Sequence, residues 1–409
     1  MKKSIQLQLS FMMFLEFFIW GGWFVTMGTF LGSNLGASGG ETAMAYSTQS
    51  WGAIIAPFII GLIADRFFNA EKILGVLHLL GAMLMYFMSQ ATEFSVFYPY
   101  VLGYMIAYMP TLALVNSVSF NQMSDPAKQF PIVRVWGTVG WILAGLAISF
   151  LFKWDSIENI SLGMLSNTFI MVSIASIVLG VFSFTLPKTP PSITKGENVS
   201  IKDILGLDAL KLLKDRNFLV FFISSVLICI PLAFYYQNIS PFLTEYQVEN
   251  STAWASLGQI SEVAFMLLLP FFFKKFGFKK TILFGMLAWV IRYLLFSYGN
   301  NGDLFFMIIT GIALHGICYD FFFVSGQIYT DSKAGEKVKS AAQGLITLAT
   351  YGVGMLVGFW IAGQVVDKNL LAGGTHGWQK IWIFPAVFAV VVMVIFALLF
   401  KDEKIEYKG

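Results

Sequence analysis

The sequence predicts an all-α polytopic membrane protein, and three observations carry this prediction. The chain of 409 residues is 57% hydrophobic and only 12% charged, so a soluble domain of this composition could not cover its own apolar surface. Apolar stretches of about twenty residues recur along the chain, and each is long enough to cross a bilayer as a helix. The stretches lack the alternation of apolar and polar residues that is typical of membrane barrel strands.

Twelve transmembrane helices are expected. Two lysines and an apolar run open the chain, as in a signal peptide, but the run is too long and no convincing small-residue cleavage site follows it. It is therefore interpreted as a retained first span. The expected spans are 8–31, 42–64, 73–91, 95–120, 131–152, 162–186, 217–241, 253–274, 280–298, 304–329, 339–366 and 377–400.

The longest polar break separates six spans from six. Residues 187–216 begin with a Pro-rich extended stretch and continue with one apolar helical face, as an interfacial helix would. The sequence predicts an N-terminal six-helix bundle at 1–186, a cytoplasmic linker at 187–216, and a C-terminal six-helix bundle with a short tail at 217–409. Two such bundles are expected to be related by pseudo-two-fold symmetry.

The placement of lysine and arginine predicts the orientation of the chain. If both termini are cytoplasmic, most of these residues fall on the cytoplasmic side, and only Lys153, Lys368 and Lys380 fall outside. Positively charged loops stay in the cytoplasm, so both termini are expected there.

Several classes of protein have no support in the sequence. Cys229 and Cys318 lie inside apolar runs, so no disulfide framework is expected. HExxH, GxSxG, Walker A and CxxC motifs are absent from the sequence, and no metal, cofactor or enzymatic activity is expected. No region indicates nucleic-acid binding, and no pore-lining motif indicates a channel.

Five ionisable residues lie well inside expected spans: Glu16, Arg134, Glu262, Arg292 and Asp320. A charge in hydrocarbon is costly, so such residues usually face a bundle interior or a wet cavity and mark function. Arg292 lies towards the outer half of its span, where a structural role is expected.

Asp320 lies in an aromatic-rich stretch, with His315 just over one helical turn before it. Burial disfavours the charged form of a carboxyl group, so Asp320 could exchange a proton near neutral pH, as a proton-coupled carrier requires. Alternatively, a buried salt bridge to Arg134 or Arg292 would keep it ionised. Both interpretations remain open.

Two further acidic residues have more than one interpretation. Glu262 and Gln259 are three residues apart and share a helix face, so a carboxylate and an amide could hold one ligand or pair with a neighbouring helix. Glu16 lies about two turns into the first apolar run, where it could bind a proton, contact a substrate or be a hydrogen-bonded structural residue.

Two basic residues are also candidates. Arg134 could reach water from the end of its span, or it could share a broad face with Thr138 and Trp141. Guanidinium, hydroxyl and indole groups together suit a polar heterocyclic or sugar ligand. Asp65 and Arg66 follow the second span, where they could pair with helix ends and hold one conformational state. Arg66 alone could be an ordinary cytoplasmic anchor.

Eight segments resemble one known family. They are FIWGGWFVTMGTFL (18–31), GLIADRFFNAEK (61–72), AYMPTLALVNSVSF (107–120), FPIVRVWGTVGW (130–141), ILGLDALKLLK (204–214), QISE (259–262), WVIRYLLFSYG (289–299) and YDFFFVSGQIY (319–329). GLIADRFFNAEK resembles the loop signature of the major facilitator superfamily, although a Phe stands where a Gly is expected. Together the segments resemble the bacterial nucleoside:proton symporters, the nucleoside permease family of that superfamily.

The resemblance implies a fold, a function and a site. It implies a major facilitator fold that imports nucleosides across the bacterial inner membrane, driven by the proton as coupling ion and surrounded by the lipid bilayer. A monomer is expected. It implies a central cavity between the halves, lined by Arg134, Thr138, Trp141, Gln259, Glu262, Tyr319 and Asp320. Where the family has polar residues in mid span 7, this chain has Ala233 and Tyr236, and Gln237 is an adjacent substitute.

The physical requirements of a nucleoside agree with these candidates. A ribose needs donors and acceptors, which Gln259, Glu262, Asn116 and Asp320 could supply, and a base needs flat stacking partners. The coupling proton is expected on Asp320 or Glu262, with Glu16 as a third candidate. Two alternatives remain: a carrier of another small polar solute such as a sugar, and a non-transporting sensor or receptor with a transporter fold.

Overall fold

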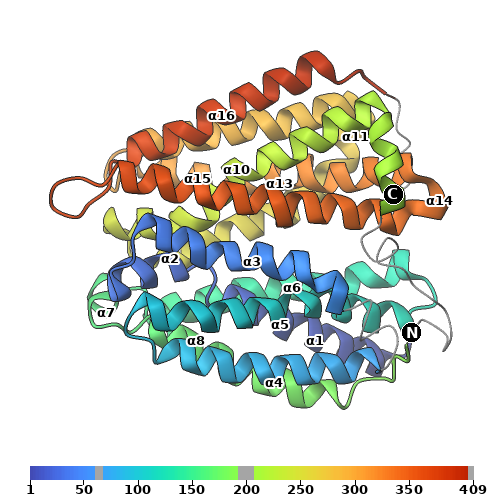
Figure 1. Cartoon of the computed structure of the whole chain (residues 1–409), viewed down its shortest axis with the longest axis horizontal. Helices are drawn as coiled ribbons and strands as arrows, with labels where there is room; N and C mark the ends of the chain where they lie inside the picture. The colour runs from blue at the N-terminus through green and yellow to red at the C-terminus, as the bar shows by residue number, and fades with distance from the viewer. Residues whose placement is uncertain (60–67, 192–206, 404–409) are drawn as a thin grey trace. The chain divides into compact units, whose positions relative to one another are not determined.

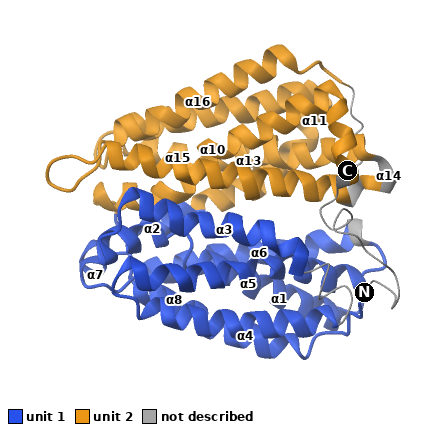
Figure 2. Ribbon diagram, viewed as in Figure 1, with its two compact units in different colours: residues 1–199, 249–256 blue, residues 200–248, 257–409 orange. Residues whose placement is uncertain are grey.

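The computed structural model describes residues 1–59, 68–191 and 207–403, and the elements in these ranges are helical apart from one isolated bridge between Leu370 and His376 (Figure 1). The chain divides into two compact units. Unit 1 comprises residues 1–199 and 249–256, and unit 2 comprises residues 200–248 and 257–409 (Figure 2). The predicted all-α fold is confirmed.

Unit 1 is built around contacts of α1 with α6, of α4 with α5 and α8, and of α3 with α5. Helices α1 and α6 approach each other closely because small residues lie at their contact. A Cβ added at Gly140 would lie 2.1 Å from the carbonyl oxygen of Phe14. Its elements are α1 (Lys3–Gly21), α2 (Met27–Thr29), η1 (Phe30–Asn34), α3 (Gly39–Ile59), α4 (Ala70–Ser89), α5 (Phe94–Asn121), α6 (Pro126–Leu146), η3 (Ala147–Leu151), α7 (Ile157–Ser161) and α8 (Ser166–Ser183).

Unit 2 is centred on α10, which packs against α15, α16 and η6. Its elements are η4 (Leu207–Lys214), α10 (Arg216–Glu245), α11 (Ser251–Tyr298), α12 (Phe305–Ala313), α13 (His315–Tyr319), η5 (Asp320–Val324), α14 (Ser325–Thr347), η6 (Leu348–Gly354), α15 (Met355–Lys368) and α16 (Trp378–Leu399). The segments η5 and η6 are π-helical, and the first residues of α11 belong to unit 1.

The expected spans can be compared directly with the observed helices. The expected spans 253–274 and 280–298 correspond to the two helices of α11, which are joined at Gly277, where φ is 75° and ψ is 176°. Glycine adopts this left-handed φ without the steric cost that a side chain would add. The expected second span corresponds to α3 as far as Ile59 and then continues outside the described residues, as do residues 192–206 of the expected linker.

A buried carboxylate fastens the start of α11 within unit 1. Asp155, between η3 and α7, is 2% exposed. Its Oδ2 accepts hydrogen bonds from Ser149 Oγ at 2.6 Å and from the backbone N–H of Thr252 at 2.9 Å. Ser149 Oγ in turn accepts from the backbone N–H of Ala253 at 2.9 Å. These bonds satisfy donors that a helix N-terminus leaves without intrahelical partners.

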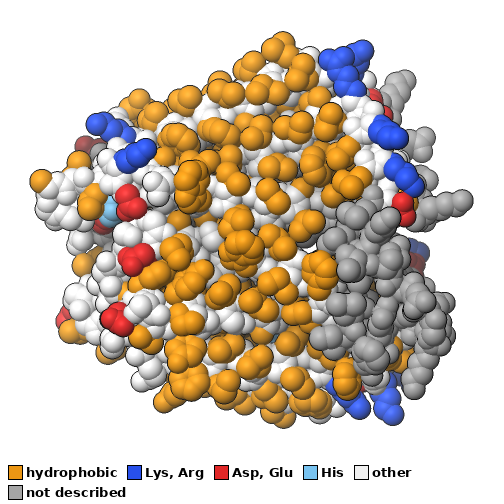
Figure 3. Space-filling view, viewed as in Figure 1, with side chains coloured by type: hydrophobic (Ala, Val, Ile, Leu, Met, Phe, Trp, Pro, Cys, Tyr) orange, Lys and Arg blue, Asp and Glu red, His pale blue; other side chains and the backbone are white. Residues whose placement is uncertain are grey.

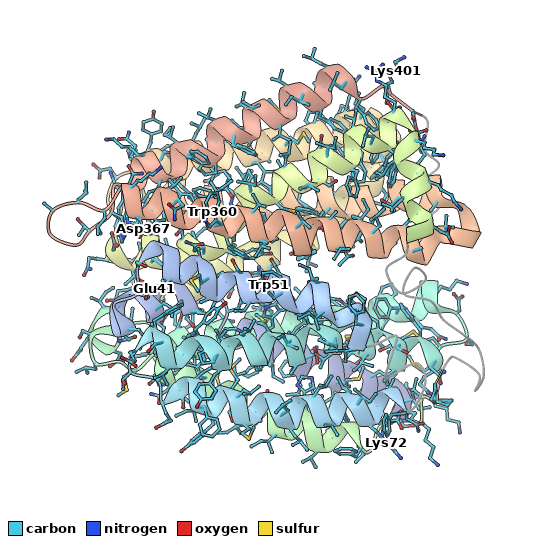
Figure 4. All side chains as sticks on the ribbon, viewed as in Figure 1. Glu41, Trp51, Lys72, Trp360, Asp367 and Lys401 are labelled. Carbon is cyan, nitrogen blue, oxygen red and sulfur yellow. The ribbon has the colours of Figure 1, made fainter. Side chains whose placement is uncertain are left out.

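The surface of each unit is suited to hydrocarbon. Ten helices in the described part of the chain are long and apolar enough to cross a membrane. Trp51 on α3 is 43% exposed and Trp360 on α15 is 64% exposed (Figure 4). In each unit, apolar side chains cover the sides of the helices, and charged side chains lie near the helix ends (Figure 3). An apolar surface of this extent indicates a multi-pass membrane protein.

Candidate functional site

Asp320 is the buried carboxylate of unit 2. It is the first residue of the π-helical turn η5 and is 0% exposed. Neither carboxylate oxygen has a hydrogen-bond partner in the described part of the chain. Asp320 interacts electrostatically with Glu262. Two carboxyl groups close together in a dry environment disfavour double ionisation, which is the property that a proton-binding site needs.

Arg292 does not neutralise Asp320 in unit 2. Its Nη1 lies 2.9 Å from His315 Nδ1, and its guanidinium carbon lies 3.5 Å from the centroid of the Tyr235 ring. Both Arg292 and His315 are almost fully buried. Because arginine only donates hydrogen bonds, His315 accepts at Nδ1 and carries its ring proton on Nε2. The salt bridge between Asp320 and Arg292, which the sequence left open, is not formed.

Glu262 is brought to Asp320 by a close contact between α11 and α13. The backbone N–H of Gly316 donates to Ser261 Oγ at 2.9 Å. A Cβ added at Gly316 would lie 2.5 Å from the carbonyl oxygen of Ser261 and 2.6 Å from the backbone nitrogen of Glu262. Only glycine allows the two backbones to approach this closely, and this approach places one carboxylate beside the other.

A half-buried group of tyrosines lies beside Glu262. The hydroxyls of Tyr319 and Tyr351 are 2.5 Å apart. Tyr319 and Tyr236 both interact electrostatically with Glu262 and with Tyr351. The sequence analysis did not identify Tyr351 as a site residue, because it lies 32 positions from Tyr319 and no motif marks it. Its proximity to Tyr319 results only from the packing of η6 within unit 2.

Two glutamines of unit 2 differ in burial. Gln237 on α10 is 0% exposed, and neither atom of its side-chain amide has a partner among the described residues. Gln259 on α11 is half-buried, like Glu262 one turn later. A buried amide without a partner is costly, so Gln237 is suited to bind a polar ligand or an ordered water.

Glu16 is a fully buried carboxylate of unit 1, and both of its oxygens have hydrogen-bond partners. His78 Nε2 lies 2.8 Å from Glu16 Oε2, and Thr111 Oγ1 donates to Glu16 Oε1 at 2.6 Å. The Tyr108 hydroxyl donates to the backbone carbonyl of Glu16 at 2.7 Å. With both oxygens occupied, the geometry favours a proton-binding or structural role over a substrate contact.

His78 was missed by the sequence analysis, although a signal was present. It lies within the expected span 73–91, where a titratable side chain is as unusual as a charged one. Its partner lies 62 positions away on α1, so the sequence could have identified the residue but not the pair.

Arg134, Thr138 and Trp141 all lie half-buried on α6. The guanidinium carbon of Arg134 lies 4.0 Å from the centroid of the Phe17 ring, a distance typical of a cation–π contact. The Trp141 ring packs edge-on against Trp20, with centroids 5.6 Å apart. Unit 1 therefore has a continuous half-buried strip of one cation, one hydroxyl and several aromatic rings.

The structure gives less information on the other residues that the sequence predicted for the site. Asn116 lies half-buried on α5. Asp65 and Arg66 lie outside the described residues. Within the described ranges, no group of three or more His, Cys, Asp or Glu side chains is placed to hold a metal ion.

Comparisons with known proteins identify the family of this chain. The family model described as "Nucleoside H+ symporter" matches residues 2–405. The putative nucleoside transporter YegT of Escherichia coli (strain K12) is 45% identical over 403 residues, covering 97% of this chain and 94% of that protein. The xanthosine permease of the same organism is 34% identical over 425 residues and covers 99% of each chain.

Solved structures show the same fold. The crystal structure of the nucleoside transporter NupG matches with a TM-score of 0.86 at 28% identity, covering 98% of this chain and 100% of that one. The POT family transporter PepTSo matches with a TM-score of 0.75 at 15% identity, covering 98% of each chain, a likeness that concerns the fold alone.

Proposed function

This chain belongs to the nucleoside H+ symporter family, and from that premise we propose that it imports nucleosides together with protons by alternating access. It is a multi-pass membrane transporter with the major facilitator fold, rather than an enzyme. The observation that carries the proposal is the Asp320 carboxylate, which is fully buried, has no hydrogen-bond partner among the described residues and interacts with Glu262.

Asp320 is the proposed proton-coupling residue. An unpaired carboxylate buried in an apolar surrounding is destabilised by several kcal/mol, and protonation removes that cost. Binding a proton therefore changes the relative free energies of conformations that bury Asp320 and conformations that expose it to water. Glu262 is assigned a share in this step because its charge opposes ionisation of Asp320. Glu16 is a second proton-binding candidate through its contact with His78.

The substrate contacts are assigned to two groups of half-buried side chains. Unit 2 contributes Gln259, Glu262 and Tyr319, with the buried Gln237 and Asp320 beside them. Unit 1 contributes Arg134, Thr138 and Trp141, with Asn116 as a further candidate. Hydroxyl, amide and carboxylate groups bind ribose hydroxyls, and indole and phenol rings stack on a base. A mixture of one cation and several carboxylates suits a neutral solute.

We further propose an inner-membrane location with both termini cytoplasmic, action as a monomer, and no cofactor besides the coupling proton. The charges at the helix ends support the orientation. In unit 1, Glu41 and Lys72 lie near opposite ends of the helices, and in unit 2 the same holds for Asp367 and Lys401 (Figure 4). Lysines stay on the cytoplasmic side, so the ends with Lys72 and Lys401 are assigned to the cytoplasm.

Uptake into membrane vesicles tests the proposed function. Vesicles containing the full chain are supplied with labelled uridine, adenosine or a sugar, with and without an inwardly directed proton gradient. We expect a nucleoside to accumulate only when the gradient is present. Gradient-driven uptake of a sugar instead would support the carrier of another polar solute. Nucleoside binding without flux would support a sensor, and the absence of gradient-dependent nucleoside uptake would refute our proposal.

A further inference from the structure

We propose that Tyr351 is a further substrate-binding residue, which acts with Tyr319 to bind two adjacent hydroxyl groups of the sugar. The two residues would thereby set a preference for ribonucleosides over 2′-deoxyribonucleosides. This inference rests on the proposed function, which it extends from the class of substrate to the part of the substrate that is recognised.

The two phenol groups are held by unusual backbone segments. Tyr351 lies within the π-helical segment η6, and Tyr319 directly precedes the π-helical turn η5. Single π-helical turns in membrane and soluble helices are frequently found at functional sites, because the inserted residue redirects side chains. Here the hydroxyls of Tyr351, within η6, and Tyr319, directly before η5, meet although the two residues lie 32 positions apart.

The backbone on either side of the tyrosine pair is tightly fixed. η6 packs against α10, and a Cβ added at Gly354, its last residue, would lie 2.8 Å from the carbonyl oxygen of Val226. Tyr319 belongs to α13, which is fastened to α11 through Gly316 and Ser261. Rigid support of this kind is what a hydrogen-bonding site needs if it is to discriminate between ligands.

The surroundings of the pair are polar and only half buried. Tyr236, Tyr319, Tyr351 and Glu262 are each partly exposed, whereas Asp320 and Phe322 are fully buried. Electrostatic interactions join Glu262 to Tyr236 and to Tyr319. A partly exposed cluster of hydroxyls around a carboxylate can be reached by a small solute.

The spacing of the two hydroxyls matches a vicinal diol. Their oxygens are one short hydrogen-bond length apart, and the two oxygens of a sugar diol are separated by a similar distance of about 2.8 Å. Each phenol both donates and accepts, so the pair can bind two adjacent sugar hydroxyls at once. A deoxy sugar lacks one of the two hydroxyls and therefore forms fewer hydrogen bonds with the pair, which lowers its affinity relative to the ribonucleoside.

Binding isotherms with matched ligands test the proposal. The full-length protein is titrated with uridine, adenosine and their 2′-deoxy counterparts. We expect the wild type to bind the better ribonucleoside about 10-fold more tightly than its deoxy form. Tyr351→Phe should reduce that ratio to about 1 by weakening the ribonucleoside alone. Tyr246→Phe is the matched control, since Tyr246 is a half-buried tyrosine of unit 2 whose ring packs on Phe242, and it should keep the wild-type ratio.

The other outcomes distinguish this proposal from the proposed function. If Tyr351→Phe keeps the wild-type ratio of affinities, or binds the ribonucleoside and its deoxy form equally more weakly, the inference is overturned. The hydroxyl pair would then be a structural link between helices. A wild type that binds both sugars equally would overturn it without affecting the proposed function. A wild type that binds no nucleoside would overturn both. If Tyr351→Phe does not fold, Tyr319→Phe removes the other hydroxyl and must give the same loss of preference.

Discussion

Asp320, Glu16 and Arg292 are all fully buried, but their surroundings compensate the charge in different ways. Glu16 has a partner at each carboxylate oxygen. Arg292 has a neutral histidine as hydrogen-bond partner and an aromatic ring over its guanidinium group. Asp320 has neither kind of compensation within the described residues. Because an uncompensated buried carboxylate is the least stable of the three in its charged form, it is the one best suited to take up and release a proton.

The first residue-scale prediction concerns Asp320. Asp320→Asn keeps the volume of the side chain but removes the proton-binding carboxyl group. We expect the accumulation ratio of a nucleoside under a proton gradient to fall to about 1, because a proton and a substrate can no longer be coupled, while exchange of labelled for unlabelled nucleoside persists. Vesicle uptake and counterflow measure the two quantities. Asp303→Asn, on an exposed turn of unit 2, is the control, and concentrative uptake by Asp320→Asn would remove Asp320 from the coupling role.

The second residue-scale prediction concerns the pair of Glu16 and His78. His78→Leu leaves one oxygen of a fully buried carboxylate without a partner, so we expect the free energy of unfolding to fall by about 3 kcal/mol. Glu16→Gln combined with His78→Leu should recover part of that loss, because the buried charge is then gone. Thermal unfolding of the purified single and double variants gives the coupling between them. Additive losses would show that the two side chains do not stabilise each other.

At the scale of elements, glycines allow two helices to come so close that site residues on one lie beside site residues on the other. Gly316 lets α13 approach α11 until their backbones touch, and this contact places Glu262 near Asp320. Tyr351 within the π-helical segment η6 meets Tyr319, which directly precedes the π-helical turn η5. The site of unit 2 is therefore a product of three irregular backbone features rather than of regular helix faces.

The element-scale prediction tests this contact. Gly316→Ala adds a Cβ at 2.5 Å from the Ser261 carbonyl, a distance that requires the helices to separate. We expect it to lower the free energy of unfolding by about 1–3 kcal/mol and to impair nucleoside transport together with stability. Gly344→Ala on α14 is the matched control, since nothing lies within 4 Å of a Cβ there, and it should be neutral or stabilising. Equal behaviour of the two variants in thermal unfolding and uptake would contradict the close-packing explanation.

At the scale of the whole molecule, the distribution of charge determines how the chain lies in the membrane. Apolar side chains cover the helix sides of each unit, and charged side chains lie near the helix ends. Within unit 2, Asp367 follows the apolar part of α15, whereas Lys401 follows α16 at the other end. Crossing hydrocarbon is unfavourable for either charge, but lysine-rich segments are the ones retained in the cytoplasm.

The whole-molecule prediction is therefore one of sidedness. The variants Asp367→Cys and Lys401→Cys, each with one added cysteine, are treated in intact cells with a membrane-impermeant maleimide. We expect labelling of Asp367→Cys from outside, and labelling of Lys401→Cys only after the cells are opened. The native Cys229 and Cys318 are buried and serve as the background. Labelling in the reverse order would contradict the orientation with cytoplasmic termini.

The sequence by itself determined the fold class, the family and the identity of most buried charges. Hydrophobicity and run length are properties of local composition, so ranges such as 217–241 and 377–400 are recognisable without coordinates. A carboxylate such as Asp320 stands out in an apolar run. The free energy of placing a charge in the membrane depends on the residue type and on its position within the span, and the sequence shows both. The break expected between the spans 253–274 and 280–298 is found in the structure as the kink at Gly277.

Only the tertiary structure decided which side chains meet. His78 pairs with Glu16 across 62 positions, Tyr351 meets Tyr319 across 32, and Arg292 bonds His315 rather than Asp320. Such contacts depend on helix packing, and at Gly316 and Gly140 the helices approach so closely that an added Cβ would clash with a neighbouring backbone. Periodicity assigns a residue to a helix face but does not say which helix lies opposite, so the partners of these charges follow from packing alone.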